Sequence, residues 1–178
     1  INFLYVAGSH PNKRHHLWPE IIFNLKVKGM NVRLVTTIAE GDYLDSLRKS
    51  FNELGISDHL INVGAVLPEH VASLVSIADG VTNTALLESF SNNFVEAWEM
   101  KKPLIVTDAD WSRGCCGKGA IFIEPLEPVK AAGKILEHYE SNGKLEQLLC
   151  NGNQQLNSLP SKLEGYNLFK SIILRVLK

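Results

Sequence analysis

The chain has 178 residues, 45% apolar and 21% charged, which suits one domain with its own hydrophobic core. Its 18 basic and 19 acidic residues nearly cancel, and this balance argues against a nucleic-acid-binding protein. The sequence contains no apolar run close to the roughly 20 residues that a membrane-spanning helix needs. The three cysteines are an odd number and predict a reducing compartment, so we expect a cytoplasmic protein.

Apolar runs and amphipathic segments alternate along the chain. Strands are expected at 2–7, 31–37, 59–63, 80–83, 103–108 and 120–123. Helices are expected at 16–28, 42–54, 68–78, 92–101, 128–139, 144–151 and from 162 to the end, with 151–161 as a helix end plus a connector. This alternation predicts an α/β fold, a Rossmann-like doubly wound parallel sheet with helices on both faces. In such a sheet, ligands bind at the carboxyl ends of the strands.

The chain starts at Ile1, directly before the first expected strand. Because a natural domain rarely begins without a lead-in, we expect that further sequence precedes it and that 1–178 form one domain of a longer protein. Four aromatic side chains on apolar helix faces are expected to pack in the core: Trp18, Phe23, Phe51 and Trp98.

The stretch 84–108 contains the most informative polar residues. Glu88 stands just before an expected helix and Glu96 lies within it, while small polar residues crowd the helix start. The first amide groups of a helix bind anions such as a diphosphate, and carboxylates accept hydrogen bonds from sugar hydroxyls. The pattern therefore suggests a phosphate-plus-polyol ligand, although it also fits a capped surface helix with two solvated glutamates.

The order of these residues resembles the signature of retaining glycosyltransferases with the GT-B architecture, the bacterial group 1 family. The resemblance rests on ESFSNNFVEA at 88–97, on KPLIVTD at 102–108 and on a strand-Gly-x-Val element at 63–66. It extends in order over nearly the whole chain. It implies the C-terminal, donor-binding domain of a two-domain enzyme whose N-terminal acceptor domain is missing from this chain.

The resemblance also implies a role for each residue of the signature. Glu88 would lie near the donor sugar and the departing phosphate, and Glu96 would bind the ribose hydroxyls. Val66 and Leu67 would lie at the nucleotide base. Backbone groups between the two glutamates would contact the sugar and the diphosphate, at Ser89, Phe90, Ser91, Asn92 and Asn93.

The loop after the first strand is implied as the other half of the site, since the family places an arginine and a lysine there to neutralise the diphosphate. Lys13 is the candidate for the lysine and is assigned a catalytic role together with Glu88. Ser9 stands at the arginine position, which is a departure from the family pattern, and Arg14 is the candidate that could compensate. The alternative for Lys13 and Arg14 is a solvated basic turn.

The function implied is transfer of a sugar from a nucleotide-sugar donor, UDP- or GDP-linked, to an acceptor with retention of anomeric configuration. The family's common role is bacterial polysaccharide biosynthesis. We expect a hexosyltransferase-type enzyme with no cofactor, an isolated fragment that binds the donor without turnover, and peripheral membrane association of the full-length enzyme only. A non-catalytic nucleotide-binding or interaction module, a degenerate transferase, is the alternative that Ser9 favours, and a nucleotide-sugar epimerase fits the signature less well.

A cluster of histidines in the first loop raises the question of a metal site. His10, His15 and His16 are close in sequence, but no carboxylate or cysteine stands near them at ligand spacing. We therefore expect no bound metal.

Overall fold

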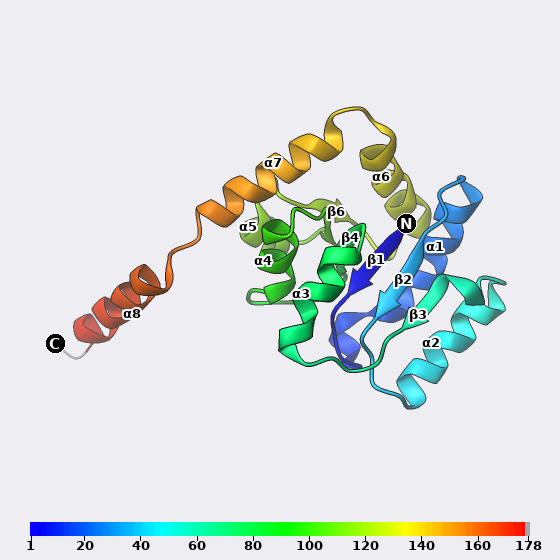
Figure 1. Ribbon diagram of the computed structural model, residues 1–178, viewed down its shortest axis with the longest axis horizontal. Coiled ribbons are helices and arrows are strands. Elements are labelled where there is room, and N and C mark those ends of the chain that lie inside the picture. The colour runs from blue at the N-terminus through cyan, green and yellow to red at the C-terminus, as the bar shows by residue number, and fades with distance from the viewer. Residues whose placement is uncertain (177–178) are drawn as a thin grey trace.

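The computed structural model describes residues 1–176 and contains one sheet of six parallel strands (Figure 1). The strands are β1 (Asn2–Tyr5), β2 (Arg33–Thr36), β3 (Leu60–Asn62), β4 (Gly80–Asn83), β5 (Leu104–Thr107) and β6 (Ile121–Ile123). Their order in the sheet is β3-β2-β1-β4-β5-β6. This is the order of a doubly wound Rossmann sheet, so the predicted fold class is confirmed.

Helices cover both faces of the sheet. They are α1 (Trp18–Val27), α2 (Asp42–Glu53), α3 (Pro68–Ile77), α4 (Asn92–Glu99), α5 (Asp110–Cys116), α6 (Pro128–Glu140), α7 (Lys144–Asn157) and α8 (Lys162–Val176). One core cluster joins the sheet to α1, α2 and α6, and the second joins it to α3, α4 and α5. Neighbouring residues of a strand point to opposite faces, so Phe3 and Tyr5 lie in the first cluster and Leu4 in the second.

Two segments differ from the sequence-based expectation. The residues 110–116, where no helix was expected, form α5, a short helix with a glycine and two cysteines that lower its intrinsic helix propensity. Helix α7 continues to Asn157, six residues into the expected connector. Gly152 does not end this helix because it packs against the indole of Trp98: a Cβ atom there would lie 2.5 Å from Trp98 Cδ1.

The aromatic core is largely as expected. Trp18, Phe51 and Trp98 are buried, with exposed fractions of 0%, 0% and 4%. Phe23 is 38% exposed, so its assignment to the core was wrong. It stands on the same helix as Ile22 and Leu25, which fill the side of α1 that faces the sheet.

Helix α8 stands apart from the rest of the chain (Figure 1). None of its described residues, 162–176, is buried, although the helix has a broad set of apolar side chains. The expected helix continued to the end of the chain, and its last two residues, 177–178, lie outside the described residues. The domain core is therefore built without α8.

Candidate functional site

The centre of the sheet creates a crevice between two loops. β1 pairs with β2 on one side and with β4 on the other. The chain leaving β1 continues to α1 on one face, whereas the chain leaving β4 continues to α4 on the opposite face. The loops 6–17 and 84–91 therefore diverge at the carboxyl edge of the sheet, where the strand order reverses and where such folds bind ligands.

An ion pair joins these two loops. The Lys13 ammonium contacts a carboxylate oxygen of Glu88. The side chains are only 25% and 15% exposed, which makes the pair partly buried. The two residues that the sequence analysis assigned to catalysis therefore meet in the structure.

Asn12 ties the same loops together through their backbones. Its side chain bonds Leu87 twice: Nδ2 donates to the carbonyl at 2.9 Å, and Oδ1 accepts from the amide at 3.2 Å. The carbonyl of Asn12 accepts from the Leu86 amide at 2.8 Å. The segment directly before Glu88 is thus held against the residue directly before Lys13.

Arg14 points inward along the carboxyl edge of the sheet. Its Nε donates to the carbonyl of Thr84 at 2.9 Å, and its Nη2 donates to Thr107 Oγ1 at 3.0 Å. The residue has a left-handed backbone, with φ of 53°, which turns the chain between two short 3-10 helices. Its guanidinium bridges the ends of β4 and β5 and is not part of a solvated turn.

Helix α4 begins at this crevice. Ser91 is its N-cap residue, and the Ser91 hydroxyl makes no capping bond to any described backbone amide. Asn93 is buried, and its Nδ2 donates to the Val6 carbonyl at 3.1 Å, which fastens α4 to the end of β1. The Phe94 amide donates to the Ser91 carbonyl at 3.1 Å. The amides of Asn92 and Asn93, the first two of the helix, have no intrahelical partner and are available to an anion.

Glu96 lies one turn further along α4. It is half-buried, and its Oε2 has no hydrogen-bond partner among residues 1–176. Burial raises the pKa of this carboxyl, because a charged group loses hydration there. A sheltered carboxylate oxygen without a partner is suited to accept a hydrogen bond from a ligand hydroxyl.

The remaining predicted residues lie at the same edge of the sheet. Ser9 is exposed in the loop after β1, and Ser89 and Asn92 are exposed around the start of α4. Val66 is half-buried against the second core cluster, whereas Leu67 is the exposed N-cap residue of α3. Phe90 packs edge-on against Phe94, with ring centroids 5.7 Å apart.

The three histidines of the first loop are dispersed in the fold. His15 is fully buried, its ring packs against that of Tyr5 at a tilt of 32° with 4.3 Å between centroids, and its Nδ1 lies 3.2 Å from the Tyr43 hydroxyl. His10 and His16 are exposed. Among residues 1–176, no three His, Cys, Asp or Glu side chains are grouped as a metal site would require.

Sequence reasoning missed Tyr5 and Asn83, which lie at the ends of β1 and β4 and contact residues of the crevice. The Tyr5 hydroxyl donates to the Lys13 carbonyl at 2.6 Å, and Asn83 contacts Glu88 and Ser91. Both are polar residues at the last position of a buried strand. That position at the carboxyl edge was the available signal.

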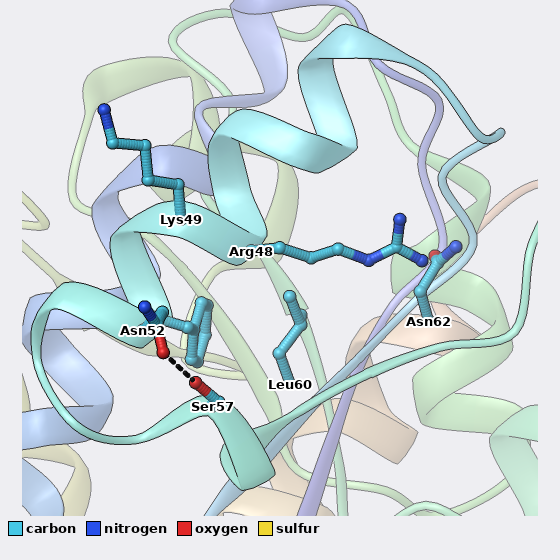
Figure 2. A pocket seen from close by; sticks show the side chains of 7 residues that line it. Arg48, Lys49, Asn52, Ser57, Leu60 and Asn62 are labelled. Atoms are coloured by element: carbon cyan, nitrogen blue, oxygen red, sulfur yellow. Dashed lines mark hydrogen bonds between the residues drawn. The ribbon is translucent and has the colours of Figure 1, made fainter.

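A separate cavity of about 560 Å³ lies at the far edge of the sheet, between α2 and β3 (Figure 2). Arg48 and Lys49 line it, but Arg48 already pairs with Glu40 at 2.8 Å and with Asp45 at 3.1 Å. The predicted residues gather instead at the centre of the sheet, so we place the candidate site there.

The fold resembles solved glycosyltransferase structures. The pneumococcal O-GlcNAc transferase GtfA, solved with UDP and GlcNAc, is 16% identical, with a TM-score of 0.78 over 99% of this chain and 36% of that chain. HepE of Anabaena, solved with UDP and glucose, is 18% identical, with a TM-score of 0.79 over 96% of this chain and 47% of that one. The C-terminal domain of the group 1 protein LpcC of Francisella tularensis is 16% identical, with a TM-score of 0.73 over 88% and 85%.

These likenesses define the class of the fold as one Rossmann-like half of the GT-B architecture. The family model described as "Glycosyl transferases group 1" matches residues 1–155, and the chain belongs to this family. No curated protein sequence matches it significantly. The chain spans about a third to a half of the length of GtfA and HepE, and no helix within residues 1–176 is long and apolar enough to cross a membrane.

Proposed function

We propose that this chain forms the donor site of a retaining glycosyltransferase that uses a nucleoside diphosphate sugar, with UDP as the favoured nucleotide. The observation that carries the proposal is the Lys13–Glu88 pair beside the start of α4, at the point where the strand order reverses. UDP is favoured because GtfA and HepE were both solved with it.

The chemistry of the crevice suits a diphosphate leaving group. A diphosphate at the start of α4 would meet the amides of Asn92 and Asn93 and the Lys13 ammonium. When the bond between the anomeric carbon and the β-phosphate oxygen breaks, negative charge grows on that oxygen, and these groups stabilise it. Once Lys13 turns to the phosphate, the Glu88 carboxylate is free to accept a hydrogen bond from a sugar hydroxyl.

Glu96 would hold the other end of the donor. Its unpartnered, sheltered Oε2 would accept hydrogen bonds from the ribose hydroxyls, while Val66 and Leu67 would lie at the base. The acceptor hydroxyl, and any catalytic group that activates it, would come from the acceptor domain beyond this chain. We therefore expect these 178 residues to bind the donor without turnover, in the cytoplasm of a bacterium that builds surface polysaccharide.

A calorimetric titration with UDP, GDP and ADP tests the donor site. UDP should bind, and Glu96→Ala should weaken binding by about 1.5–3 kcal/mol, the range for a hydrogen bond to a charged group. Glu99→Ala is the matched control, because Glu99 is an exposed carboxylate on the same helix. Equal affinity of the wild type and Glu96→Ala would contradict the ribose assignment. Retention would be tested on the full-length enzyme from the anomeric configuration of its product by NMR.

One observation supports the degenerate-module alternative. Arg14 is bonded to Thr84 and Thr107, and Ser9 brings no charge, so within residues 1–176 Lys13 is the cation that faces Glu88. A site with one cation could bind the nucleotide without accelerating the cleavage of the bond between the sugar and the diphosphate. Nucleotide binding by this chain, together with an inactive full-length protein, would favour this alternative.

A further inference from the structure

Asn83 is a polar side chain in a fully buried place. All four residues of β4 are buried, and Asn83 itself is 0% exposed. A buried amide costs free energy unless its donors and acceptor are bonded, whereas an apolar side chain would carry no such requirement. A residue that opposes the local pattern of a buried strand indicates a functional position.

The Asn83 amide is bonded at both ends. Its Oδ1 accepts from the Ala85 amide at 3.0 Å and lies 3.4 Å from the Tyr5 hydroxyl. Its Nδ2 donates to Ser91 Oγ at 3.1 Å and to Glu88 Oε1 at 3.4 Å. The Asn83 side chain therefore contacts three parts of the site. They are the Tyr5 hydroxyl, which is bonded to the Lys13 carbonyl, the Glu88 carboxylate, which pairs with Lys13, and Ser91, the N-cap residue of α4.

The bond to Ser91 has a consequence for α4. The hydroxyl oxygen of an N-cap serine ordinarily accepts from the second or third amide of its helix. Ser91 Oγ instead accepts a hydrogen bond from the Asn83 side-chain Nδ2 and makes no capping bond within the described chain. The amide of Asn93, the second of the helix, is thereby left without a side-chain cap.

We propose that Asn83 is a positioning residue of the donor site: it holds the Glu88 carboxylate beside Lys13 and draws the Ser91 hydroxyl away from the α4 amides, so that the diphosphate site is set before the ligand arrives. This role rests on the proposed donor site. Asn83 acts through Glu88 and Ser91 and does not itself contact the donor.

Two substitutions separate this role from simple structural support. Asn83→Asp keeps the acceptor for Ala85 and loses the donor for Ser91 and Glu88. Asn83→Leu removes both ends without adding charge. The matched control is Thr82→Val, because Thr82 is buried in the same strand and its hydroxyl has no partner within residues 1–176.

Calorimetry with UDP should show affinity about tenfold weaker in both Asn83 variants, which corresponds to the loss of a hydrogen bond to a charged group. Thr82→Val should bind like the wild type. Wild-type affinity in either Asn83 variant would overturn the positioning role alone. Absence of UDP, GDP and ADP binding by the wild type would overturn the donor site, and the positioning role with it.

Amide hydrogen exchange measured by NMR on the unliganded chain gives a second readout. In Asn83→Leu, the released Ser91 hydroxyl should cap the helix and slow exchange at Asn93. Structural damage alone would accelerate this exchange, so the direction of the change discriminates between the two roles. Unchanged or faster exchange at Asn93 would overturn the proposal even if nucleotide binding were weakened.

Discussion

Lys13 and Glu88 form a partly buried ion pair although they are 75 residues apart in the chain. Lys13→Met should lower the free energy of unfolding by about 1 kcal/mol or somewhat more, because it leaves a sheltered carboxylate unpaired. In a double-mutant cycle with Glu88→Gln, the two losses should not add. Denaturant unfolding measures all four proteins.

The exposed Lys49–Glu53 pair is the control for this cycle. Its N–O distance is 3.8 Å and its side chains are 76% and 62% exposed. Its coupling free energy should be about zero to 0.5 kcal/mol. Coupling as small as this at Lys13–Glu88 would show that the pair in the crevice does not hold the two loops together.

The burial of His15 predicts sensitivity to acid. Burial first, and then the nearby Lys13 and His16, lower the pKa of His15 from 6.5 to about 4. The unfolded chain therefore binds a proton more readily than the folded chain. The stability contributed by neutral His15 is complete above pH 6.5 and is lost as the pH falls towards 4, by about 3 kcal/mol in total.

This dependence can be isolated by substitution. His15→Phe keeps a ring packed against Tyr5 and removes the titration, so its free energy of unfolding should change less between pH 7 and 4 than that of the wild type. His16→Gln is the exposed control and should follow the wild type. Parallel pH profiles for His15→Phe and the wild type would refute the assignment.

Glu96 should favour ligand binding at the expense of stability. Because burial raises its pKa in the folded state, the folded chain retains a proton that the unfolded chain releases, and stability falls as the pH rises through this pKa. Glu96→Gln should therefore melt at or above the wild-type temperature at pH 7 while binding UDP more weakly. A clear fall in melting temperature would show that the carboxylate stabilises the fold.

Gly152 should not tolerate a methyl group. Because a Cβ atom there would overlap the Trp98 indole, Gly152→Ala should destabilise the domain by about 1–3 kcal/mol. Gly133→Ala, within α6, is the opposite case: apart from its own helix backbone and chain neighbours, no atom of residues 1–176 lies within 4 Å of the added Cβ. It should stabilise the domain by about 0.5–1 kcal/mol. Thermal unfolding of both variants checks the contrast, and equal effects would contradict it.

Removal of α8 should leave the domain intact. A chain ending at Ser161 loses a helix whose described residues are all outside the core, so its melting temperature should stay within a few degrees of the full chain. Its solubility should rise, because a surface rich in apolar side chains is removed. A large fall in melting temperature would mean that α8 packs on the domain in solution.

Local patterns in the sequence determined the fold class and the two glutamates. Strand and helix alternation depends on the period of apolar residues over a few positions, and it predicted all six strands and most helices to within a few residues. It missed α5, whose glycine and cysteines are weak helix formers, and it ended α7 early at a glycine that fits beside Trp98. The ESFSNNFVEA signature located Glu88 and Glu96, and their roles stay predictions.

Only the tertiary structure decided which polar groups face the crevice and which are already bonded. Arg14 reaches Thr107, 93 positions away, and Asn93 reaches Val6, 87 positions away. Asn83 has its partners on β1, in the following loop and at the start of α4. A hydrogen bond depends on distance and direction in space, and sequence periodicity contains neither for residues that the sheet brings together from distant parts of the chain.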